Sequence, residues 1–507
     1  MERGYTHGDH QGFIQPAKDF FADTYTGPFR LPRNFSTLRD RFHIYIARRF
    51  FARSPFAASV LIENRYGLSL YWSMLISYLK KKEVLHGIRY RYRRDGYPAM
   101  HTFRAESPLI AAGSKLHSAA AHKNRTLALI KCIGELLERH FLAMPTDAER
   151  KNMVSASVDT LVKDGKDHAN VFTYNRFLPI QKEHTPRLRF DTSKPIQWVR
   201  GRNISKNRAA LLPTQTTFWL NGHSMQHKEG TVHEPTTSGC AGYTTKTGAV
   251  VRGLKEHIQR DGFMCYWLTQ TSPNVIAGET IPDAMTQTLL EEFKKFKFDI
   301  YILDITTNIG LPTVTIVAID RGTQRPRMHV TAASHVDPLA AISDGLYEMS
   351  SLIGCFDNGN ETSLPEDFKP FLTSFGRLSR IQYLHGEEML KKVEWFWQSK
   401  SITFSEFSRA FPSIEDDDRH ALTHILELLK QLGEGYDAYI YEAQSPVLKT
   451  LRYHAVRTCV PKLMPLYLSE NCATLDSDRL CEFAEWKGTT YNPHELLSGV
   501  IPPHPFP

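Results

Sequence analysis

Three stretches decide the fold: Ala128–Arg139 (ALIKCIGELLER), Ala249–Arg260 (AVVRGLKEHIQR) and Ala341–Ser351 (AISDGLYEMSS). They share one sequence pattern that is typical of a helix. In each stretch an alanine stands seven residues before a glutamate, and a very small residue stands three before it. Residues three and seven apart lie on one face of a helix. The repeat therefore predicts three helices, each presenting a carboxylate beside a surface with little side-chain bulk.

The small residues of the repeat allow two interpretations. They are Cys132, Gly253 and Gly345, and the glutamates are Glu135, Glu256 and Glu348. A glycine inside a helix costs roughly 1 kcal/mol relative to alanine, so its presence needs a reason. Close packing of each helix is one reason. The other is a shared site, in which the three carboxylates hold hard cations and the missing side chains leave room for a bulky anion.

Further polar residues in the first two copies favour the shared site. Glu138 and Arg139 follow the first glutamate, and Gln259 and Arg260 follow the second, so that both copies read E-x-x-[EQ]-R. Carboxylates three apart on one helix face attract magnesium. An arginine beside them suits phosphate oxygens. This pattern indicates a metal-dependent phosphate site.

The wider sequence resembles the YcaO family. The resemblance rests on GELLERH, TTSGCAGYTT with GLKEHIQRDGFMCYW, ASHVDPLAAISDGLYE and the terminal PHPFP, taken in this order and spacing over residues 105–507. It implies a mixed α/β (α+β) fold with β-sheets flanked by helices around a central ATP cavity. It also implies an enzyme that binds ATP and Mg²⁺ without a P-loop and phosphorylates a backbone amide oxygen of a peptide.

The resemblance implies roles for particular residues. The metal ligands would be Glu135, Glu138, Glu256 and Glu348, with Gln259 as a weaker candidate. Arg139 and Arg260 would face the phosphates as catalytic groups. Gly113, Ser114 and Lys115, together with Thr237, Ser238 and Gln259, would border the nucleotide. A surface lysine is the alternative for Lys115, because lysine meets phosphate as a point charge but is also common in solvent.

The chain departs from the family pattern at three positions. Gln259 stands where the second helix of the family commonly has glutamate, and it offers a neutral oxygen in place of a charge. Ser351 stands where glutamine is frequent, and Ser238 where asparagine is usual. Consequently we expect one metal to be held more weakly, or through water.

The terminal P-x-P-x-P marks family members that form azolines on ribosomal peptides. Pro503, Pro505 and Pro507 enforce extended geometry, so that little conformational entropy is lost when the tail docks. We therefore expect an ordered tail. By resemblance it would reach the active site, where the free carboxylate of Pro507 helps to place or deprotonate the substrate.

These features predict a cyclodehydratase that converts Cys, Ser or Thr of a ribosomally made precursor peptide to thiazoline or oxazoline, with ATP and Mg²⁺ as cofactors. Two alternatives stay open. One is a related enzyme that makes thioamides or macroamidines by the same activation. The other is a nucleotide-binding scaffold without turnover, to which Gln259 and Ser351 give weight. P-loop, dinucleotide, zincin and serine-hydrolase motifs are absent from the sequence, so those classes lose their support.

Composition indicates an ordinary globular protein of the cytoplasm. The 507 residues are 41% hydrophobic and 23% charged, with a net charge of +8. Seven cysteines form no C-x-x-C pair, and no segment has the length of a membrane span or the pattern of a signal peptide. We expect neither nucleic acid nor membrane as a partner. The family implies a separate leader-recognition protein resembling ubiquitin-activating enzymes, and a flavin-dependent azoline dehydrogenase in the same complex.

Residues 1–104 match nothing in the family and form an N-terminal extension; the catalytic domain would span residues 105–507 and end in the tail, 503–507. In IRYRYRRDGY (residues 88–97) arginines alternate with tyrosines, which fits a solvated edge strand or a surface that docks a partner.

Local patterns give further expectations. Residues 69–82 should form a helix, residues 111–124 a loop of small residues, and residues 298–330 buried strands. The acidic tract at 415–418 should begin a solvated helix that Gly433 ends. Asp261 should fix Arg260 or cap a helix end.

Overall fold

The computed structural model describes residues 75–93, 100–111, 114–220, 229–322, 327–353, 366–415, 417–498 and 502–506, together with Trp72, Pro98 and Leu364. Gly113 and Pro507, both expected at the site, lie outside the described residues. So do residues 1–71.

The three repeated stretches form the three long helices that the sequence predicts. They are α4 (Arg125–Phe141), α11 (Lys246–Leu268) and α13 (Pro338–Ile353). The side chain of Asn124 caps α4 by accepting hydrogen bonds from two backbone N–H groups, and that of Thr245 caps α11 by accepting one, from Gly248. Each helix begins soon after a strand, so that three strand–helix units recur along the chain.

Each of these helices packs on a different β-sheet. The first sheet has the order β1-β2-β3, with strands β1 (Gly87–Arg93), β2 (Met100–Ala111) and β3 (Ser114–His122). Helix α4 packs on β2 and β3. The second sheet has the order β12-β11-β10-β9-β13, with strands β9 (Asn274–Ile276), β10 (Phe298–Asp304), β11 (Thr313–Asp320), β12 (Arg327–Ser334) and β13 (Ser401–Ile402). Helix α13 packs on β11 and β12.

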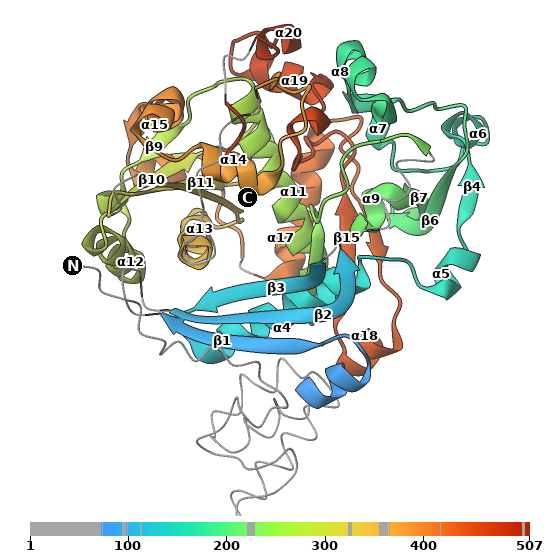
Figure 1. Ribbon diagram of the computed structural model, residues 1–507, viewed down its shortest axis with the longest axis horizontal. Helices are drawn as coiled ribbons and strands as arrows, with labels where there is room; N and C mark the ends of the chain where they lie inside the picture. Colours follow the sequence, from blue (N-terminus) through green and yellow to red (C-terminus); the bar gives the residue numbers. More distant parts are fainter. Residues whose placement is uncertain are drawn as a thin grey trace, which may run out of the picture.

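The third sheet has the order β4-β6-β14-β15-β8, and β7 pairs with β6. Its strands are β4 (Val154–Ala156), β6 (Ile196–Asn203), β7 (Arg208–Pro213), β8 (Cys240–Tyr243), β14 (Tyr439–Glu442) and β15 (His454–Cys459). Helix α11 packs on β8 and β15. Figure 1 shows α11 near the middle of the molecule, and α13 between β11 on one side and β3 on the other. These layers confirm the expected fold of sheets flanked by helices.

Short elements complete the described chain. The helices are α5 (Asp147–Lys151), α6 (Val158–Lys163), α7 (Val171–Tyr174), α8 (Pro179–His184), α9 (Thr214–Thr217), α12 (Ala284–Lys295), α14 (Arg377–Tyr383), α15 (Glu387–Val393), α16 (Phe404–Ser408), α17 (Asp418–Gln431), α18 (Pro446–Leu451), α19 (Asp478–Trp486) and α20 (Pro493–Leu496). The 3-10 turns are η1 (Pro186–Leu188), η2 (Gly278–Thr280), η3 (Glu394–Phe396) and η4 (Glu470–Cys472). Strands β5 (Asn175–Arg176) and β16 (Asp476–Ser477) pair with each other.

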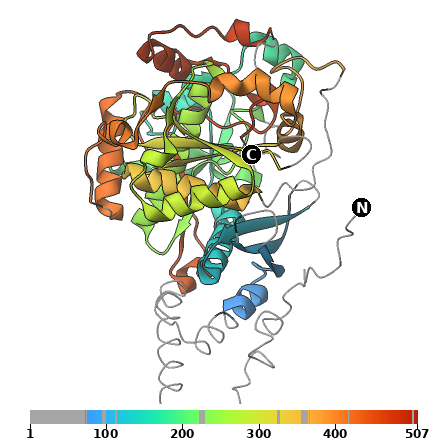
Figure 2. The ribbon, with the colours of Figure 1, turned by 90° about the vertical axis from the view of Figure 1, so that its left-hand side faces the viewer.

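The division between residues 104 and 105 does not coincide with a structural boundary, because β2 runs through it. Residues 75–81 are helical, as expected, and Leu75 and Leu79 are buried in the same core as α4. Figure 2 shows α4 and the sheet of β1–β3 together in the lower part of the molecule. A docking role for this N-terminal part stays a prediction.

The expected loop at residues 111–124 is wrong, because Ser114–His122 is strand β3. Small residues suit a strand here for a packing reason. Ser118 is fully buried under α4, and its hydroxyl donates to the carbonyl of Cys132 at 2.8 Å. Side chains larger than serine or alanine would hold the helix away from the strand.

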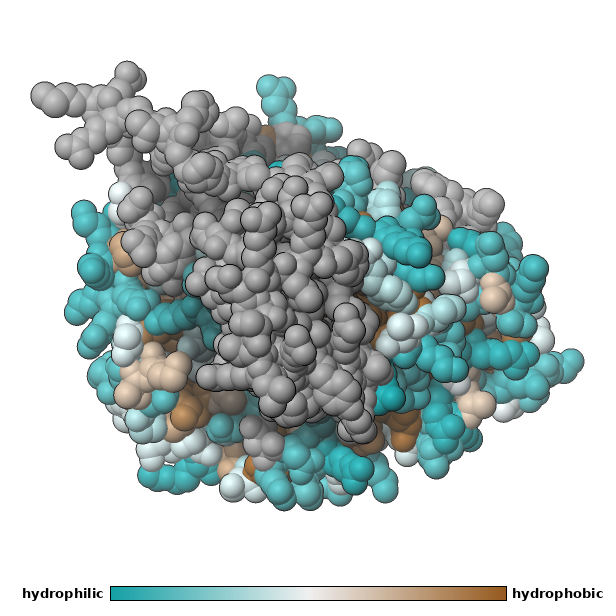
Figure 3. Space-filling model, turned by 90° about the horizontal axis from the view of Figure 1, so that it is seen from below, coloured by the Kyte–Doolittle hydropathy of each residue, from teal (hydrophilic) through white to brown (hydrophobic). Residues whose placement is uncertain are grey.

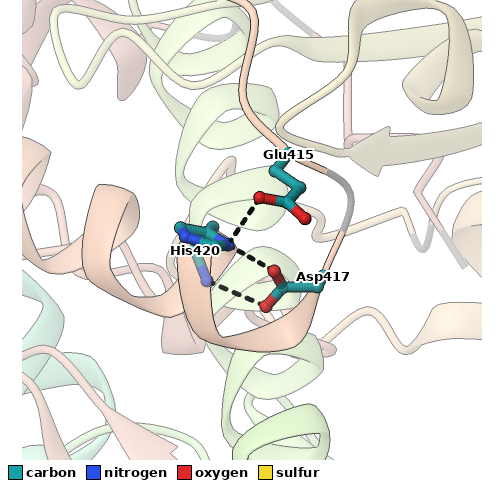
Figure 4. Close-up of side chains that lie close together, drawn as sticks. All are labelled: Glu415, Asp417 and His420. Atoms are coloured by element: carbon teal, nitrogen blue, oxygen red, sulfur yellow. Dashed lines mark hydrogen bonds and ion pairs between the residues drawn. The ribbon is translucent and has the colours of Figure 1, made fainter.

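The acidic tract behaves as expected. Figure 4 shows Glu415, Asp417 and His420 at the start of α17, where Asp417 accepts the backbone N–H groups of Arg419 (2.7 Å) and His420 (3.1 Å). The helix ends before Gly433, whose φ of +86° favours glycine. The tract is therefore a helix cap on the surface.

The surface seen from below is mostly hydrophilic where it is described (Figure 3). No helix within the described ranges combines the length and the apolar character that crossing a bilayer requires.

Candidate active site

A cavity of about 770 Å³ lies where the three strand–helix units meet, and it brings three distant glutamates together. Glu135 comes from α4, Glu256 from α11 and Glu348 from α13, and all three line its wall. Gln259 and Ser351 also line it, so two of the three departures from the family pattern face this space. The cavity is large enough for a nucleotide-sized ligand.

The first two glutamates are held in the same way. The backbone N–H of Ala119, in β3, donates to Glu135 at 3.1 Å, and Arg139 pairs with the same carboxylate at 2.6 Å. The backbone N–H of Gly239, just before β8, donates to Glu256 at 2.7 Å, and Arg260 pairs with it at 2.6 Å. In each unit a strand N–H and an arginine one turn later therefore fix the carboxylate.

The third glutamate has no such arginine, since Leu352 stands one turn after Glu348. Glu348 lies in the wall of the cavity, with protein around it on the other sides. Its side chain is exposed to the open space of the cavity. Partial desolvation, followed by the negative charge of Glu256, raises the pKa of Glu348 to about 7. Water in the cavity would screen part of this repulsion. A cation between the carboxylates would relieve it.

Glu138 lies behind the first glutamate on α4. Burial, and then the charges of Glu256 and Glu135, raise its pKa well above the usual range of a carboxyl. It does not line the cavity itself. Its predicted role as a metal ligand would therefore require that Glu138 turns toward Glu135.

Of the residues that the sequence predicts at the nucleotide, only some lie near the cavity. Ser238 is buried, and its hydroxyl accepts a hydrogen bond from Arg260 at 2.5 Å, which places it beside the second unit. Thr237 is half-buried and makes a backbone turn to Cys240. Lys115 is exposed in β3 and is absent from the cavity wall, and Ser114 starts the same strand.

The small residues of the repeat face the sheets and not the cavity. A Cβ at Gly253 would lie 2.7 Å from Cγ2 of Thr458 in β15, and one at Gly345 would lie 2.9 Å from Cγ1 of Ile316 in β11. Cys132 is fully buried, with its sulfur 3.5 Å from the hydroxyl of Ser118. Close helix packing is therefore the correct interpretation of these positions. The idea that they leave room for an anion is wrong.

The residues four positions before each glutamate face the cavity instead. They are Lys131, Arg252 and Asp344. Sequence reasoning missed them, although the same helical periodicity that selects the third residue back also selects the fourth. Lys255 adds another cation to the wall. The wall thus mixes cations with carboxylates, which suits a ligand that carries phosphates and a metal.

Asp261 does neither of the things expected of it. Its carboxylate forms a two-pronged, fully buried ion pair with Arg479 of α19, whose Nη2 lies 2.7 Å from Oδ2, and it also accepts the backbone N–H of Met464 at 2.9 Å. His335 lines the cavity, while Asp337 caps α13 by accepting the N–H of Leu339 at 3.0 Å.

The C-terminal tail is packed into the protein, as expected for residues 502–506. Phe506 lies against Phe263 of α11, with ring centroids 4.9 Å apart. His504 is fully buried against the guanidinium of Arg380 and lies 3.1 Å from the carbonyl of Tyr467. Because Phe263 is one turn beyond Gln259 on α11, the tail docks close to the cavity.

Comparison with known proteins identifies the class. A family model described as YcaO cyclodehydratase, ATP- and Mg²⁺-binding, matches residues 123–464. This match covers more than half of the sequence, so the chain belongs to the YcaO family. ATP and Mg²⁺ are accordingly the ligands of this family.

The individual relatives are distant. An uncharacterized protein of Methanothermobacter thermautotrophicus is 23% identical over 163 residues, which are 32% of this chain and 42% of that protein. An uncharacterized protein from the tfuA 3′ region of Rhizobium leguminosarum bv. trifolii is 28% identical over 131 residues, which are 25% of this chain and 30% of that protein. The matched stretch spans less than half of either relative.

Solved structures share the fold. A heterocyclase in complex with substrate and cofactor has a TM-score of 0.64 at 17% identity, and the match covers 84% of this chain and 55% of that chain. YcaO from Methanopyrus kandleri, bound with AMPPCP and Mg²⁺, has a TM-score of 0.54 at 15% identity, with coverages of 76% and 88%. The YcaO-like fold expected from the sequence is confirmed.

The donor set of the cavity fits Mg²⁺. Its acidic ligands are carboxylate oxygens, which hard cations prefer. Glu348 pairs with no arginine among the described residues, and desolvation, followed by the charge of Glu256, raises its pKa. Glu135, Glu256 and Glu348 are therefore the residues that would hold the ion.

Proposed function

We propose that the chain is an ATP- and Mg²⁺-dependent cyclodehydratase that converts Cys, Ser or Thr of a ribosomally made precursor peptide to thiazoline or oxazoline. One observation carries the proposal: carboxylates from three helices far apart in the sequence line one cavity of about 770 Å³. A packing role alone would not require three charged groups of one sign at the same place.

In this reaction the side chain of the substrate residue attacks the preceding carbonyl carbon. The oxygen of the resulting hemiorthoamide takes the γ-phosphoryl group of ATP, and loss of phosphate leaves the ring. The peptide loses the elements of one water, and ATP becomes ADP and phosphate. The difficult step is the expulsion of oxygen from an amide, and phosphorylation makes that oxygen a good leaving group.

The chain contributes position and charge. Mg²⁺, when bound, neutralises charge on the triphosphate. Glu135 and Glu256 are fixed by strand N–H groups, so they present oxygens of defined direction. Arg139 and Arg260 pair with two of the cavity glutamates and would face phosphate oxygens in the loaded site.

The tail and the partners complete the proposal. Docking of Phe506 on α11 supports a position for Pro507 near the substrate, where its carboxylate would accept a proton from the attacking group. The proposed partners are the precursor peptide, a separate leader-recognition protein and a flavin-dependent dehydrogenase that oxidises azoline to azole.

Phosphate release in the presence of a precursor peptide tests the proposal. Glu256→Gln and Glu135→Gln should each lower the peptide-dependent rate by at least about a hundredfold, because each removes charge that is needed in the transition state. Glu427→Gln, on the exposed face of α17, is the matched control and should keep the rate of the unaltered chain. A near-normal rate in both cavity variants would refute the site.

Product mass, taken with ring-specific absorbance, separates the alternative chemistries, because forming a macroamidine also removes one water. Azoline formation removes one water per modified residue, whereas a thioamide exchanges oxygen for sulfur. A scaffold without turnover would consume no ATP with any candidate peptide.

A further inference from the structure

A second cavity, of about 380 Å³, opens in the third sheet at a place that the proposed reaction does not use. Strand β6 pairs along one edge with β7. Along its other edge it pairs with β4 at residues 196–198 and with β14 at residues 202–203. Residues 199–201 lie between these two partners and pair with neither. We call this interruption the β6 notch; its walls are residues 199–202, residues 440–442 and the α5 region.

Strand β14 leaves its edge open at the same place. Tyr441 and Glu442 pair with β15 on their other side, and the pairing of β14 with β6 ends at Ile440. Gly201 explains where the two strands part: a Cβ there would lie 2.4 Å from the carbonyl oxygen of Ile440. The strands touch at Gly201 and diverge beyond it. Backbone groups of both edges therefore face the notch, and such edges accept an extended chain.

The floor of the notch is apolar and its rim is basic. Val199 and Ile440 are 6% and 4% exposed. Arg200 and Arg202 are exposed on the opposite face of β6, two residues apart. Neither arginine has a carboxylate partner among the described residues, and Arg202 donates only to Asn207.

The acidic groups of the notch already have partners. Glu442 pairs with Lys246 at 2.7 Å and with His454 at 2.8 Å. Glu149 accepts the hydroxyl of Tyr441 and the backbone N–H of Thr146. The hydrogen bonds to Glu149 come from neutral groups, so its charge stays. The wall therefore carries three cations, Arg200, Arg202 and Lys246, against the two carboxylates of Glu149 and Glu442, and this positive excess favours an occupant with negative side chains.

We propose that the β6 notch binds an extended acidic segment of the peptide that the cavity modifies, by adding this segment to the edge of β6. Apolar side chains of the segment would point to Val199, and acidic side chains at alternate positions would reach Arg200 and Arg202. This inference rests on the proposed function, because it takes the substrate to be a peptide. The enzyme would then also bind residues of the peptide that it does not modify.

Binding of a short fluorescent peptide of alternating glutamate and valine, measured by anisotropy on the full chain without ATP, tests the proposal. We expect binding to the unaltered chain, and a loss of about tenfold in affinity for Arg200→Glu or Arg202→Glu. Arg409→Glu, at an exposed position after α16, is the control and should bind as the unaltered chain does. A peptide of alternating lysine and valine should not bind.

Two results would overturn the proposal. One is equal binding of the glutamate and lysine peptides. The other is photo-crosslinking of a benzophenone-labelled glutamate peptide to segments other than residues 199–202 and 440–444. The test contains no ATP, so its failure is distinct from a failure of peptide-dependent phosphate release. Thermal melting shows whether each variant is folded, which is expected because both arginines are exposed.

Discussion

Glu348 differs from the two other cavity glutamates in one contact, and this difference has a chemical consequence. Glu135 and Glu256 each pair with an arginine, whereas the pKa of Glu348 is raised to about 7 by desolvation and by the charge of Glu256. Among the described residues, Glu348 is therefore the one of these three glutamates that pairs with no arginine. A bound divalent ion is the simplest counter-charge.

A buried histidine contributes to the acid stability of the chain. His329 of β12 is 5% exposed, and burial, followed by the charges of His385 and Arg327, lowers its pKa to about 3. In the unfolded chain it titrates near 6.5. Between these values the unfolded state binds the extra proton, so this stability is present above about pH 6.5 and is lost as pH falls.

We expect the free energy of unfolding to fall by about 1.4 kcal/mol per pH unit below pH 6 from this histidine alone. Urea unfolding at a series of pH values measures it. His329→Gln should flatten the slope by about one proton, whatever its effect on stability at neutral pH. An unchanged slope would contradict the buried, neutral state of His329.

Single residues also show what the sequence could and could not predict. The spacing of the repeat predicts the shared position of Glu135, Glu256 and Glu348, because charged groups on equivalent helix faces follow the same geometry. It does not reveal Asp261 as the partner of Arg479, since two residues 218 apart meet only through the tertiary fold. Helix periodicity predicts which face of the helix a residue lies on. It does not predict which residue of another element packs against that face.

The strand–helix unit is the element on which the site is built. In two units a backbone N–H of the strand segment reaches the glutamate on the following helix, 16 and 17 residues later. That contact requires the helix to lie close to its strand. Gly253 and Cys132 permit this approach, so the small residues act on the site indirectly, through helix position.

Gly253→Ala tests this packing. An alanine would ordinarily stabilise a helix by about 1 kcal/mol relative to glycine. Here the new Cβ would lie 2.7 Å from Cγ2 of Thr458 and 2.9 Å from the carbonyl oxygen of Gly239. We expect a net loss of about 1–3 kcal/mol in denaturant unfolding.

Adding Thr458→Ala should recover part of this loss, because it removes the two contacts with the Thr458 side chain and leaves the contact with the carbonyl of Gly239 in place. A Gly253→Ala chain as stable as the unaltered chain would show that α11 has room at this position.

Elements were predicted best where periodicity is strong. The three helices and the strands β10 and β11 follow their patterns. Strand β3 was not predicted. Its run of serines and alanines has the composition of a loop, and the contact with α4 that favours a strand is not visible in the sequence. Its strand character comes from packing under α4.

At the scale of the whole molecule, the C-terminal part is joined to α11 through a buried ion pair. Arg479 of α19 and Asp261 of α11 are both fully buried, and Arg479 also donates to Asn308 at 2.6 Å. The tail lies on the same helix through Phe506 and Phe263. One helix thus carries Glu256 and also anchors the end of the chain.

Asp261→Asn should destabilise the protein by about 3–5 kcal/mol, because it leaves the charge of Arg479 buried without its partner. Thermal or denaturant unfolding measures this loss. The double variant with Arg479→Met should be more stable than Asp261→Asn alone, since it removes the uncompensated charge. Additive losses would contradict direct coupling of the two side chains.

The central claim is that three helices from distant parts of the chain hold one metal–nucleotide complex. A structure determined with Mg²⁺ and a non-hydrolysable ATP analogue tests it most directly. The account predicts the triphosphate in the cavity, with Mg²⁺ bound by oxygens of Glu135, Glu256 and Glu348 at about 2.1 Å or through one water. A nucleotide bound elsewhere, with these glutamates still contacting only arginines and backbone, would contradict it.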